Sequence, residues 1–500
     1  MRCRSCGKQI PNGSNFCMHC GAYLGRVTAV DADVERRLLA AELKSLQFSP
    51  TDFRYAVEDL RKYLSEEAYI RYKARVEAAL ARAFLRRGLI DEKICEEIEK
   101  ACREVTAAEV YEEERRIKHD IRALVNVIRR KVSDAAKPFV HLTATSYDIV
   151  DTANALRLRD ATLNVVLPDM LALEHCWIQL ARRERATLQI GRTHGQHAEP
   201  ITFGFAIALY VERWGTRILK LKEAAENLVG KFSGAVGAYN AASLLFDDPE
   251  AFEREVLAEL GLEPARISTQ IVPPEPLNDF VHAVVSAFSV LANFCDDMRH
   301  LQRTEIGEIA EAFAAEQVGS STMPHKRNPI TFEGVKSLWK RFMPFVVTAH
   351  LDQISEHQRD LTNSASQRYI PELLVIFDHC VRTIRRASER LVVDAERMRR
   401  NFELSKDKII AEPLYVLLSI YGHPDAHECV RRLVTKAEKE GKTLKEVVFE
   451  DEELTGYIER FTPLQREIAF NPERYIGIAA EKAKSVADYW EKRLNDLFEA

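Results

Sequence analysis

The sequence comprises 500 residues, of which 46% are hydrophobic and 29% are charged, as in ordinary globular proteins. Its 71 lysine and arginine residues against 76 acidic residues give a formal net charge of −5, so no overall positive field favours nucleic acid or an anionic membrane. The hydrophobic and charged fractions together exclude disordered and fibrous proteins. The longest apolar stretch, Phe280 to Phe294, is interrupted by polar residues and is shorter than the roughly 20 residues that span a bilayer. Because the N-terminus has no signal-peptide pattern, we expect a cytoplasmic protein without a membrane span.

The first 25 residues contain four cysteines in two closely spaced pairs. They form the pattern C-x2-C-x10-C-x2-C and are Cys3, Cys6, Cys17 and Cys20. This spacing allows four thiolates to surround Zn²⁺ tetrahedrally, and we expect a zinc ribbon with a structural metal ion. Two disulfides are the alternative, which is disfavoured because the other six cysteines are scattered singly and nothing indicates secretion.

The same region is basic. Four cationic residues occur in it without an acidic residue nearby: Arg2, Arg4, Lys8 and Arg26. A region of this charge could bind nucleic acid or an acidic surface of another protein. A docking or stabilising appendage is the favoured interpretation.

The rest of the chain is predicted to be almost entirely helical. Three long stretches contain neither glycine nor proline and are predicted to form long helices: Leu89 to Lys137, Leu277 to Ile306, and Glu372 to Glu412. In the first, apolar residues recur at helical spacing, and His119 falls on the side away from the apolar stripe. Strand patterns are not found beyond residue 25, and no glycine-rich phosphate loop occurs. We therefore predict an all-α fold.

A polar segment between two predicted helices carries chemistry that a helical scaffold does not need. Residues 319–329 read G-S-S-T-M-P-H-K-R-N-P. Ser320 and Ser321 offer hydroxyl groups, while Lys326 and Asn328 offer a cation and an amide donor suited to a carboxylate substrate. A flexible connector is the alternative, but the second half of the segment lacks connector composition.

This segment resembles the signature loop of the fumarase/aspartase superfamily, whose members eliminate fumarate by cleaving a C–N or C–O bond. Five other segments are similar to the adenylosuccinate lyase family, in the family's order: K-H-D (118–120), H-L-T-A-T-S-Y-D-I-V-D-T-A (141–153), G-R-T-H-G-Q-H-A-E-P-I-T-F-G (191–204), S-T-Q (268–270) and Q-R-D-L-T-N-S-A-S-Q-R (358–368). The resemblance runs from about Phe53 to at least residue 410. It implies a three-domain lyase with a long central helix bundle, a homotetramer with shared active sites, nucleotide substrates and no cofactor for catalysis.

The resemblance also implies domain boundaries. We expect a zinc ribbon at 1–25, a linker or helix at 26–50, an N-terminal helical domain at 51–140, a central helix-bundle domain at 141–395 with the signature loop at 317–330, and a C-terminal helical domain at 396–500.

The implied reaction is β-elimination of fumarate from adenylosuccinate, giving AMP, and from its succinylated aminoimidazole carboxamide counterpart. By resemblance, Ser320 is the general base when the loop closes, with Ser321 the less favoured choice. His194 matches the general acid that protonates the leaving nitrogen, and His119 matches a residue that assists it. His197 and His325 are expected to be structural or supporting.

The substrate-binding residues implied by the resemblance fall into three sets. The succinyl and amide parts match His141, Thr145, Ser146 and Gln270. The phosphate matches Arg54, Tyr55, Arg359, Ser364 and Arg368, among which guanidinium groups suit bidentate binding. Asp120, Ser321, Lys326 and Asn328 complete the predicted site.

The chain departs from the family pattern at several positions. Thr143 replaces a usual glycine, Pro-Pro-Glu-Pro stands at 273–276, Gln358 replaces a glutamate, and Ser405 to Pro413 lacks a usual glycine and charged pair. These departures leave substrate affinity and preference open. The competing hypotheses are another superfamily member, such as a carboxymuconate cycloisomerase or argininosuccinate lyase, and a non-catalytic scaffold whose ribbon binds nucleic acid or protein.

Overall fold

The computed structural model describes residues 2, 6–9, 48–312, 322–323 and 325–498. The chain divides into two compact units, Met1–Ala56 and Val57–Ala500. In the first unit the described elements are an antiparallel bridge between Arg2 and Gln9 and the short helix η1 (Pro50–Asp52). Cys6 is exposed, whereas the predicted ligands Cys3, Cys17 and Cys20 lie outside the described residues.

The second unit begins with five helices: α2 (Glu58–Leu64), α3 (Glu66–Arg86), α4 (Glu92–Glu104), α5 (Ala107–Ile117) and α6 (Asp120–Arg130). The prediction of a long helix over Leu89 to Lys137 was wrong, because α4, α5 and α6 share that stretch. Thr106 and Glu109 form a capping box that starts α5. Lys118 ends it in the left-handed conformation at φ 58°, and His119 caps α6. Side-chain and left-handed helix caps therefore divide this stretch into three helices, although it contains no glycine or proline.

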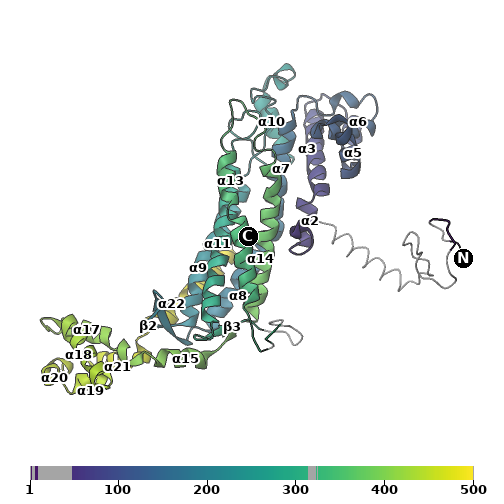
Figure 1. Ribbon diagram of the computed structural model, residues 1–500. Coiled ribbons are helices and arrows are strands. Elements are labelled where there is room, and N and C mark those ends of the chain that lie inside the picture. Colours follow the sequence, from purple (N-terminus) through teal and green to yellow (C-terminus); the bar gives the residue numbers. More distant parts are fainter. Residues whose placement is uncertain (1, 3–5, 10–47, 313–321, 324, 499–500) are drawn as a thin grey trace. The chain divides into compact units, whose positions relative to one another are not determined.

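A long helical rod crosses the second unit. It consists of α7 (Ser146–Ala161), the π-helical turn η3 (Thr162–Val166) and α8 (Leu167–Arg183), which follow one another without a break. At the rise of an α-helix, the rod spans roughly 55 Å. Figure 1 shows α3 and α6 beside its first end and the strands at its other end.

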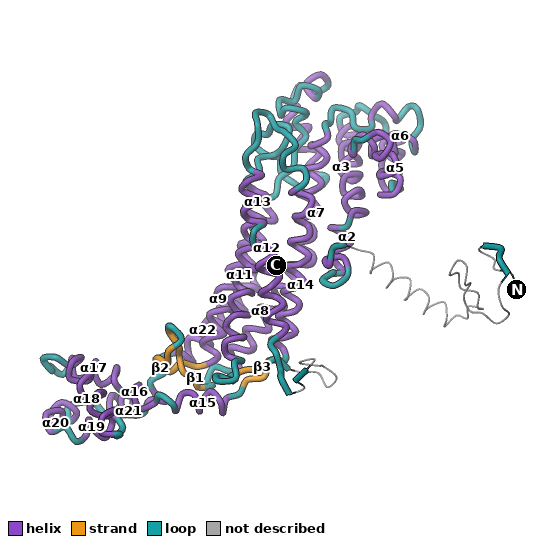
Figure 2. The backbone as a smooth tube through the Cα atoms, viewed as in Figure 1, coloured by secondary structure: helices purple, strands orange, loops and turns teal. Residues whose placement is uncertain are grey.

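Further long helices pack along the rod to form a bundle, as Figure 2 shows. They are α9 (Phe203–Glu226), α11 (Glu275–Leu301), α12 (Ile330–Phe342), α13 (Phe345–Asp352), α14 (Ile370–Glu389) and α22 (Ala479–Phe498). Trp177, Trp214 and Phe294 are fully buried in its core. Among the described residues α11 alone is long and apolar enough to cross a membrane, but 67% of that window is buried, as in the core helix of a soluble protein.

The last helix fits against a glycine in the bundle. A side chain at Gly215 of α9 would overlap the ring of Trp490 on α22. The indole N–H of Trp490 donates to Glu212 at 2.7 Å, one turn earlier on α9. Helix α22, which lies within the predicted C-terminal domain, packs on α8 and α9 of the bundle.

Four strands depart from the expected all-helical body. β1 (Leu188–Thr193) and β2 (Gln196–Thr202) form an antiparallel hairpin with Gln189 opposite Ile201, and β3 (Ile309–Ala310) pairs with β4 (Val392–Val393). The hairpin turns at His194 and Gly195, whose φ angles are 53° and 74°. Positive φ at both turn residues is typical of tight hairpins, but His-Gly is not one of the usual Asn-Gly or Asp-Gly signals, so the hairpin was not predicted from the sequence.

The C-terminal part contains α15 (Ala395–Glu403), α16 (Lys406–Ile409), α17 (Ala411–Ile420), α18 (Ala426–Glu440), α19 (Leu444–Phe449), α20 (Glu452–Ile458) and α21 (Pro463–Phe470). The predicted helix over Glu372 to Glu412 is divided, because β4 follows α14 and Asp394 caps α15. Helices α17 to α21 share a hydrophobic core of their own. The remaining short elements are η2 (Lys137–Phe139), η4 (Ala242–Leu244), α10 (Pro249–Ala258), η5 (Ser366–Tyr369) and η6 (Pro472–Arg474).

Candidate active site

A cavity of about 500 Å³ lies at the first end of the rod, between α3, α6, α7 and the segment before α14. Seven of the residues predicted from sequence line it: His119, Asp120, Ser146, Gln270, Arg359, Ser364 and Arg368. They come from four segments far apart in the chain. The cavity is therefore the candidate active site.

The start of α6 supplies two of these residues. His119 is half exposed, and its Nδ1 accepts a hydrogen bond from the backbone N–H of Arg122 at 3.3 Å. It thus lies at a helix end and not on a helix face. Asp120 Oδ2 lies 3.4 Å from Lys73 Nζ. Burial is the largest single influence and would raise the pKa of Asp120, but the charge of Lys73, its hydrogen bond and the N–H of Ile121 together lower that pKa below its usual value.

The segment before α14 supplies the cationic side of the cavity. Arg368 Nη1 donates to Ser364 Oγ at 3.3 Å. All three guanidinium nitrogens of Arg359 are buried, and none has a hydrogen-bond partner among the described residues. A buried guanidinium without partners is costly unless an anion binds to it. Arg359, beside Ser364 and Arg368, is therefore poised to hold an anionic ligand.

The turn that leads into α7 holds two predicted residues that do not line the cavity. His141 Nδ1 lies 2.7 Å from Glu77 Oε1. Burial is the largest single influence and would lower the pKa of His141, but the charge and hydrogen bond of Glu77, together with the charge of Asp148, raise it. Thr145 forms a capping box with Asp148. Thr143, the residue that replaces a glycine, has φ 64° and so keeps a glycine-like backbone conformation at this turn.

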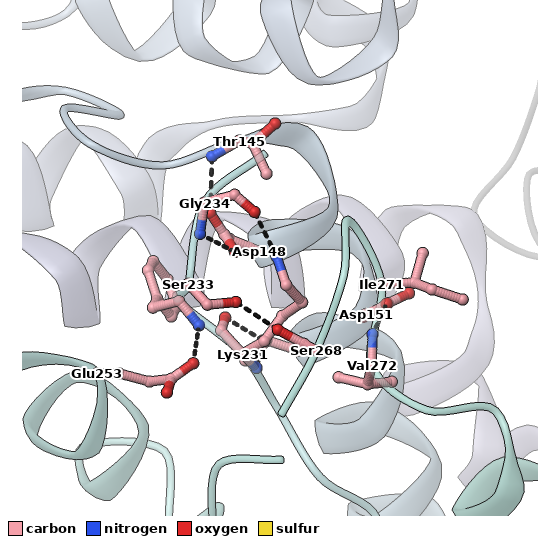
Figure 3. A network of polar contacts seen from close by, with 12 residues as sticks. Thr145, Asp148, Asp151, Lys231, Ser233, Gly234, Glu253, Ser268, Ile271 and Val272 are labelled. Carbon is pink, nitrogen blue, oxygen red and sulfur yellow. Dashed lines mark hydrogen bonds and ion pairs between the residues drawn. The ribbon is translucent and has the colours of Figure 1, made fainter. Parts of the chain in front are cut away.

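A buried polar network lies behind the cavity (Figure 3). Asp148 accepts hydrogen bonds from the backbone N–H groups of Thr145 at 2.8 Å and Gly234 at 3.3 Å, and it pairs with the ammonium group of Lys231. Ser233 and Ser268 share a hydrogen bond of 2.5 Å between their Oγ atoms. The network thus ties the start of α7 to the segment that carries Gln270.

Asp151, one turn further along α7, belongs to the same network. Its Oδ2 accepts the N–H of Val272 at 3.0 Å. Burial raises the pKa of Asp151 to about 7. The backbone of Gln270 in turn donates to Gln358 O at 3.4 Å, next to Arg359.

His194 lies at the tip of the β1–β2 hairpin, at the opposite end of the bundle from α6 (Figure 1). His197, on β2, has its Nδ1 2.8 Å from Ser405 Oγ, and burial lowers its pKa. Arg192 pairs with the fully buried Glu308, which precedes β3. The hairpin is therefore anchored to the segment before the signature loop.

The described part of the signature loop lies at the same end as the hairpin. Glu311, next to β3, accepts the N–H groups of Thr331 and Phe332 at 3.0 Å and so holds the start of α12, just after the loop. Lys326 is exposed and Asn328 is half buried. The backbone N–H of Lys326 donates to Met323 O at 3.0 Å. Ser320 and Ser321 lie outside the described residues.

Within one chain, then, the predicted residues form two groups. The cavity gathers seven of them, whereas His194, Lys326 and Asn328 lie near the other end of the rod, roughly 55 Å away by its helical rise. Arg54 and Tyr55 belong to the first unit, whereas the residues that line the cavity belong to the second.

Ten further residues line the cavity, and the sequence had singled out no role for them; they include Tyr69, Tyr147, Asn154 and Arg157. Asn154 and Arg157 follow Ser146 by eight and eleven residues, so they share one face of α7. Helical spacing from Ser146 could have identified them.

Comparisons with known proteins identify the family to which the chain is similar. A lyase family model matches residues 49–343, a model of the adenylosuccinate lyase C-terminal domain matches residues 355–466, and a zinc-ribbon domain model matches residues 2–24. The adenylosuccinate lyase of Pyrococcus horikoshii is 40% identical over 452 residues, which cover 89% of this chain and 98% of that protein. That of Pyrococcus abyssi is 41% identical, with coverage of 89% and 98%.

Solved structures show the same fold. The 3-carboxy-cis,cis-muconate lactonizing enzyme of Pseudomonas putida matches with a TM-score of 0.76 and 25% identity, over 88% of this chain and 99% of that chain. The prediction of a mainly helical fumarase/aspartase-like fold is thereby confirmed, apart from the short strands.

Proposed function

The chain belongs to the adenylosuccinate lyase family and is a C–N lyase, and from that membership we propose that it eliminates fumarate from adenylosuccinate and from its succinylated aminoimidazole carboxamide ribotide counterpart. The products are AMP and the ribotide carboxamide. The observation that carries the proposal is Arg359, whose buried guanidinium has no hydrogen-bond partner among the described residues and which lines the cavity beside Ser364 and Arg368. The phosphate monoester common to both substrates supplies the anion that this group requires.

In the proposed reaction, a proton leaves the succinyl carbon next to a carboxylate, the C–N bond breaks, and the new C=C bond gives fumarate. Ser320 takes the proton when the signature loop closes and excludes water. Lys326 and Asn328 stabilise the negative charge that develops on the carboxylate. His194 donates a proton to the leaving nitrogen, with His119 assisting. No step needs a metal ion or a cofactor.

We further propose that each site is built from more than one copy of the chain, in a homotetramer. The support is the separation of the cavity from His194, Lys326 and Asn328 along the rod. A rigid rod of that length does not bring its two ends together, whereas packing of symmetric copies can place one chain's hairpin beside another chain's cavity.

The N-terminal ribbon is proposed to hold one structural zinc ion through Cys3, Cys6, Cys17 and Cys20. The match of the zinc-ribbon model to residues 2–24 supports it. We also propose a cytoplasmic location and retain the domain boundaries predicted from the sequence.

The test is direct. The purified chain is mixed with adenylosuccinate without added metal, and fumarate and AMP are measured, with Ser320→Ala and Ser321→Ala run alongside. Equal release of both products, lost by at least about 10²-fold in Ser320→Ala and largely kept in Ser321→Ala, is expected. A folded wild-type chain that releases neither product would contradict the proposed function.

A further inference from the structure

Arg157 is a second guanidinium in the cavity whose charge is poorly compensated. Its side chain lies on α7 and lines the cavity, yet the residue is only 4% exposed. Within the described part of the chain, its one hydrogen bond runs from Nε to Asn154 Oδ1 at 3.0 Å, and no carboxylate lies within ion-pair distance. Burial lowers the pKa of Arg157 below its ordinary value and outweighs the opposing effects of Tyr69 and of the more distant carboxylate of Glu66.

One contact offsets part of this cost. The guanidinium of Arg157 lies over the ring of Tyr69, 3.9 Å from the centroid. Lys73 Nζ lies 3.9 Å from the centroid of the same ring. A cation–π contact recovers less free energy than the burial of an unpaired charge costs. Because Lys73 and Arg157 share the ring of Tyr69, this contact compensates only part of the charge of Arg157, and binding of an anion would compensate more of it.

The position of Arg157 indicates which anion it meets. Ser146, Val150, Asn154 and Arg157 line the cavity from one face of α7. The rise of the helix places Arg157 about 16 Å beyond Ser146 along the axis. If Ser146 holds the succinyl end of the substrate, as the family resemblance implies, the anionic group that reaches Arg157 is at the opposite end of the nucleotide.

We propose that Arg157 is a further substrate-binding residue, which contacts the phosphate monoester of the nucleotide from the α7 side of the cavity. The phosphate would then lie between Arg157 and the cationic set that contains Arg368. This assignment rests on the proposed function for the orientation of the substrate. The physical basis of the assignment is the buried guanidinium of Arg157, with which a phosphate oxygen would form an ion pair.

The alternative is that Arg157 serves only to pack against Tyr69. Calorimetry with AMP as the probe separates the two, using the full chain with Arg157→Gln, Arg157→Lys and the matched control Arg460→Gln. Arg460 also lies over a tyrosine ring, that of Tyr421, at 5.1 Å, but among the C-terminal helices. Fumarate is titrated as a second probe, and unfolding midpoints are recorded for every variant.

We expect Arg157→Gln to weaken AMP binding at least tenfold and to leave fumarate binding within twofold. Arg157→Lys keeps the charge and loses the planar fork, so it should recover part of the AMP affinity. Arg460→Gln should leave AMP binding unchanged. If Arg157→Gln binds AMP within twofold of the wild type, or weakens AMP and fumarate equally, the assignment is overturned.

The proposed function can fail separately. A wild-type chain that binds AMP through Arg157 but releases no fumarate from adenylosuccinate would refute the lyase reaction and leave the phosphate contact standing. A folded wild-type chain that does not bind AMP would refute the contact.

Discussion

The ammonium group of Lys231 contacts the carboxylate of Asp148 in the interior of the second unit, where both side chains are inaccessible to solvent. The same ammonium group donates to Gly234 O at 3.1 Å, and Asp148 caps α7 through Thr145. One ion pair thus fixes the start of the cavity-lining helix against the loop behind it.

Replacing Lys231 by Met should lower the free energy of unfolding by about 3–5 kcal/mol, because it leaves the buried carboxylate of Asp148 unpaired. Chemical denaturation measures the change. Lys222→Met, which removes a partly exposed pair with Glu226, is the control and should cost at most about 1 kcal/mol. A loss below 1 kcal/mol for Lys231→Met would show that water or another group reaches Asp148.

Glu174 should make stability depend on pH. It is fully buried on α8, neither carboxylate oxygen has a partner among the described residues, and burial with the nearby charge of Glu212 raises its pKa well above the usual value. The folded chain therefore keeps a proton that the unfolded chain loses above about pH 4.3. The free energy of unfolding should fall as pH rises above that value, by up to about 1.4 kcal/mol per pH unit for this group.

Glu174→Gln removes that dependence, so it should be more stable than the wild type at pH 8 and similar to it at pH 5. Thermal unfolding across this range is the measurement, with the exposed Glu481→Gln as control. If the unfolding temperatures of the wild type and of Glu174→Gln change with pH in parallel, this interpretation is wrong.

Variants of the two ends of the rod should complement each other. His194→Gln and Arg359→Gln are each expected to lack activity as pure proteins. When the two are unfolded together and reassembled, some sites combine an intact hairpin with an intact cavity, and fumarate release should return. Mixtures that stay inactive, although mass measurement shows hybrid assemblies, would mean that each site uses a single chain.

The ribbon should hold zinc without contributing to the reaction. Elemental analysis of the purified chain should give about one zinc ion per chain, since four thiolates close a tetrahedral site. Cys6→Ser should lose the metal and keep fumarate release. Loss of activity together with zinc, at unchanged folding of the second unit, would give the ribbon a catalytic role that the present proposal lacks.

The sequence predicted much of the cavity, because residues such as Arg359 and Gln270 occur in segments that resemble a known family. It did not predict Arg157, which belongs to no polar motif and is recognised only when α7 shows its face to the cavity. Nor did it predict the breaks at Thr106 and Lys118, since these depend on side-chain caps and a left-handed residue within a sequence of good helix formers.

The hairpin illustrates a different limit. Its strands are short and sit among helices, and tertiary contacts such as the pair between Arg192 and Glu308 hold them. The strand propensity of the local sequence does not reveal such tertiary contacts. The tip residue His194 was assigned by resemblance, but its distance from the cavity is a property of the rod and emerges only in three dimensions.

The fit of Trp490 against Gly215 has a consequence for how the chain is made. Residue 215 leaves the ribosome long before residue 490, so the groove on α9 stays open while the whole C-terminal segment is synthesised. The bundle therefore cannot finish packing during translation. Chains cut short before α22 should expose this apolar groove and depend on chaperones or be degraded.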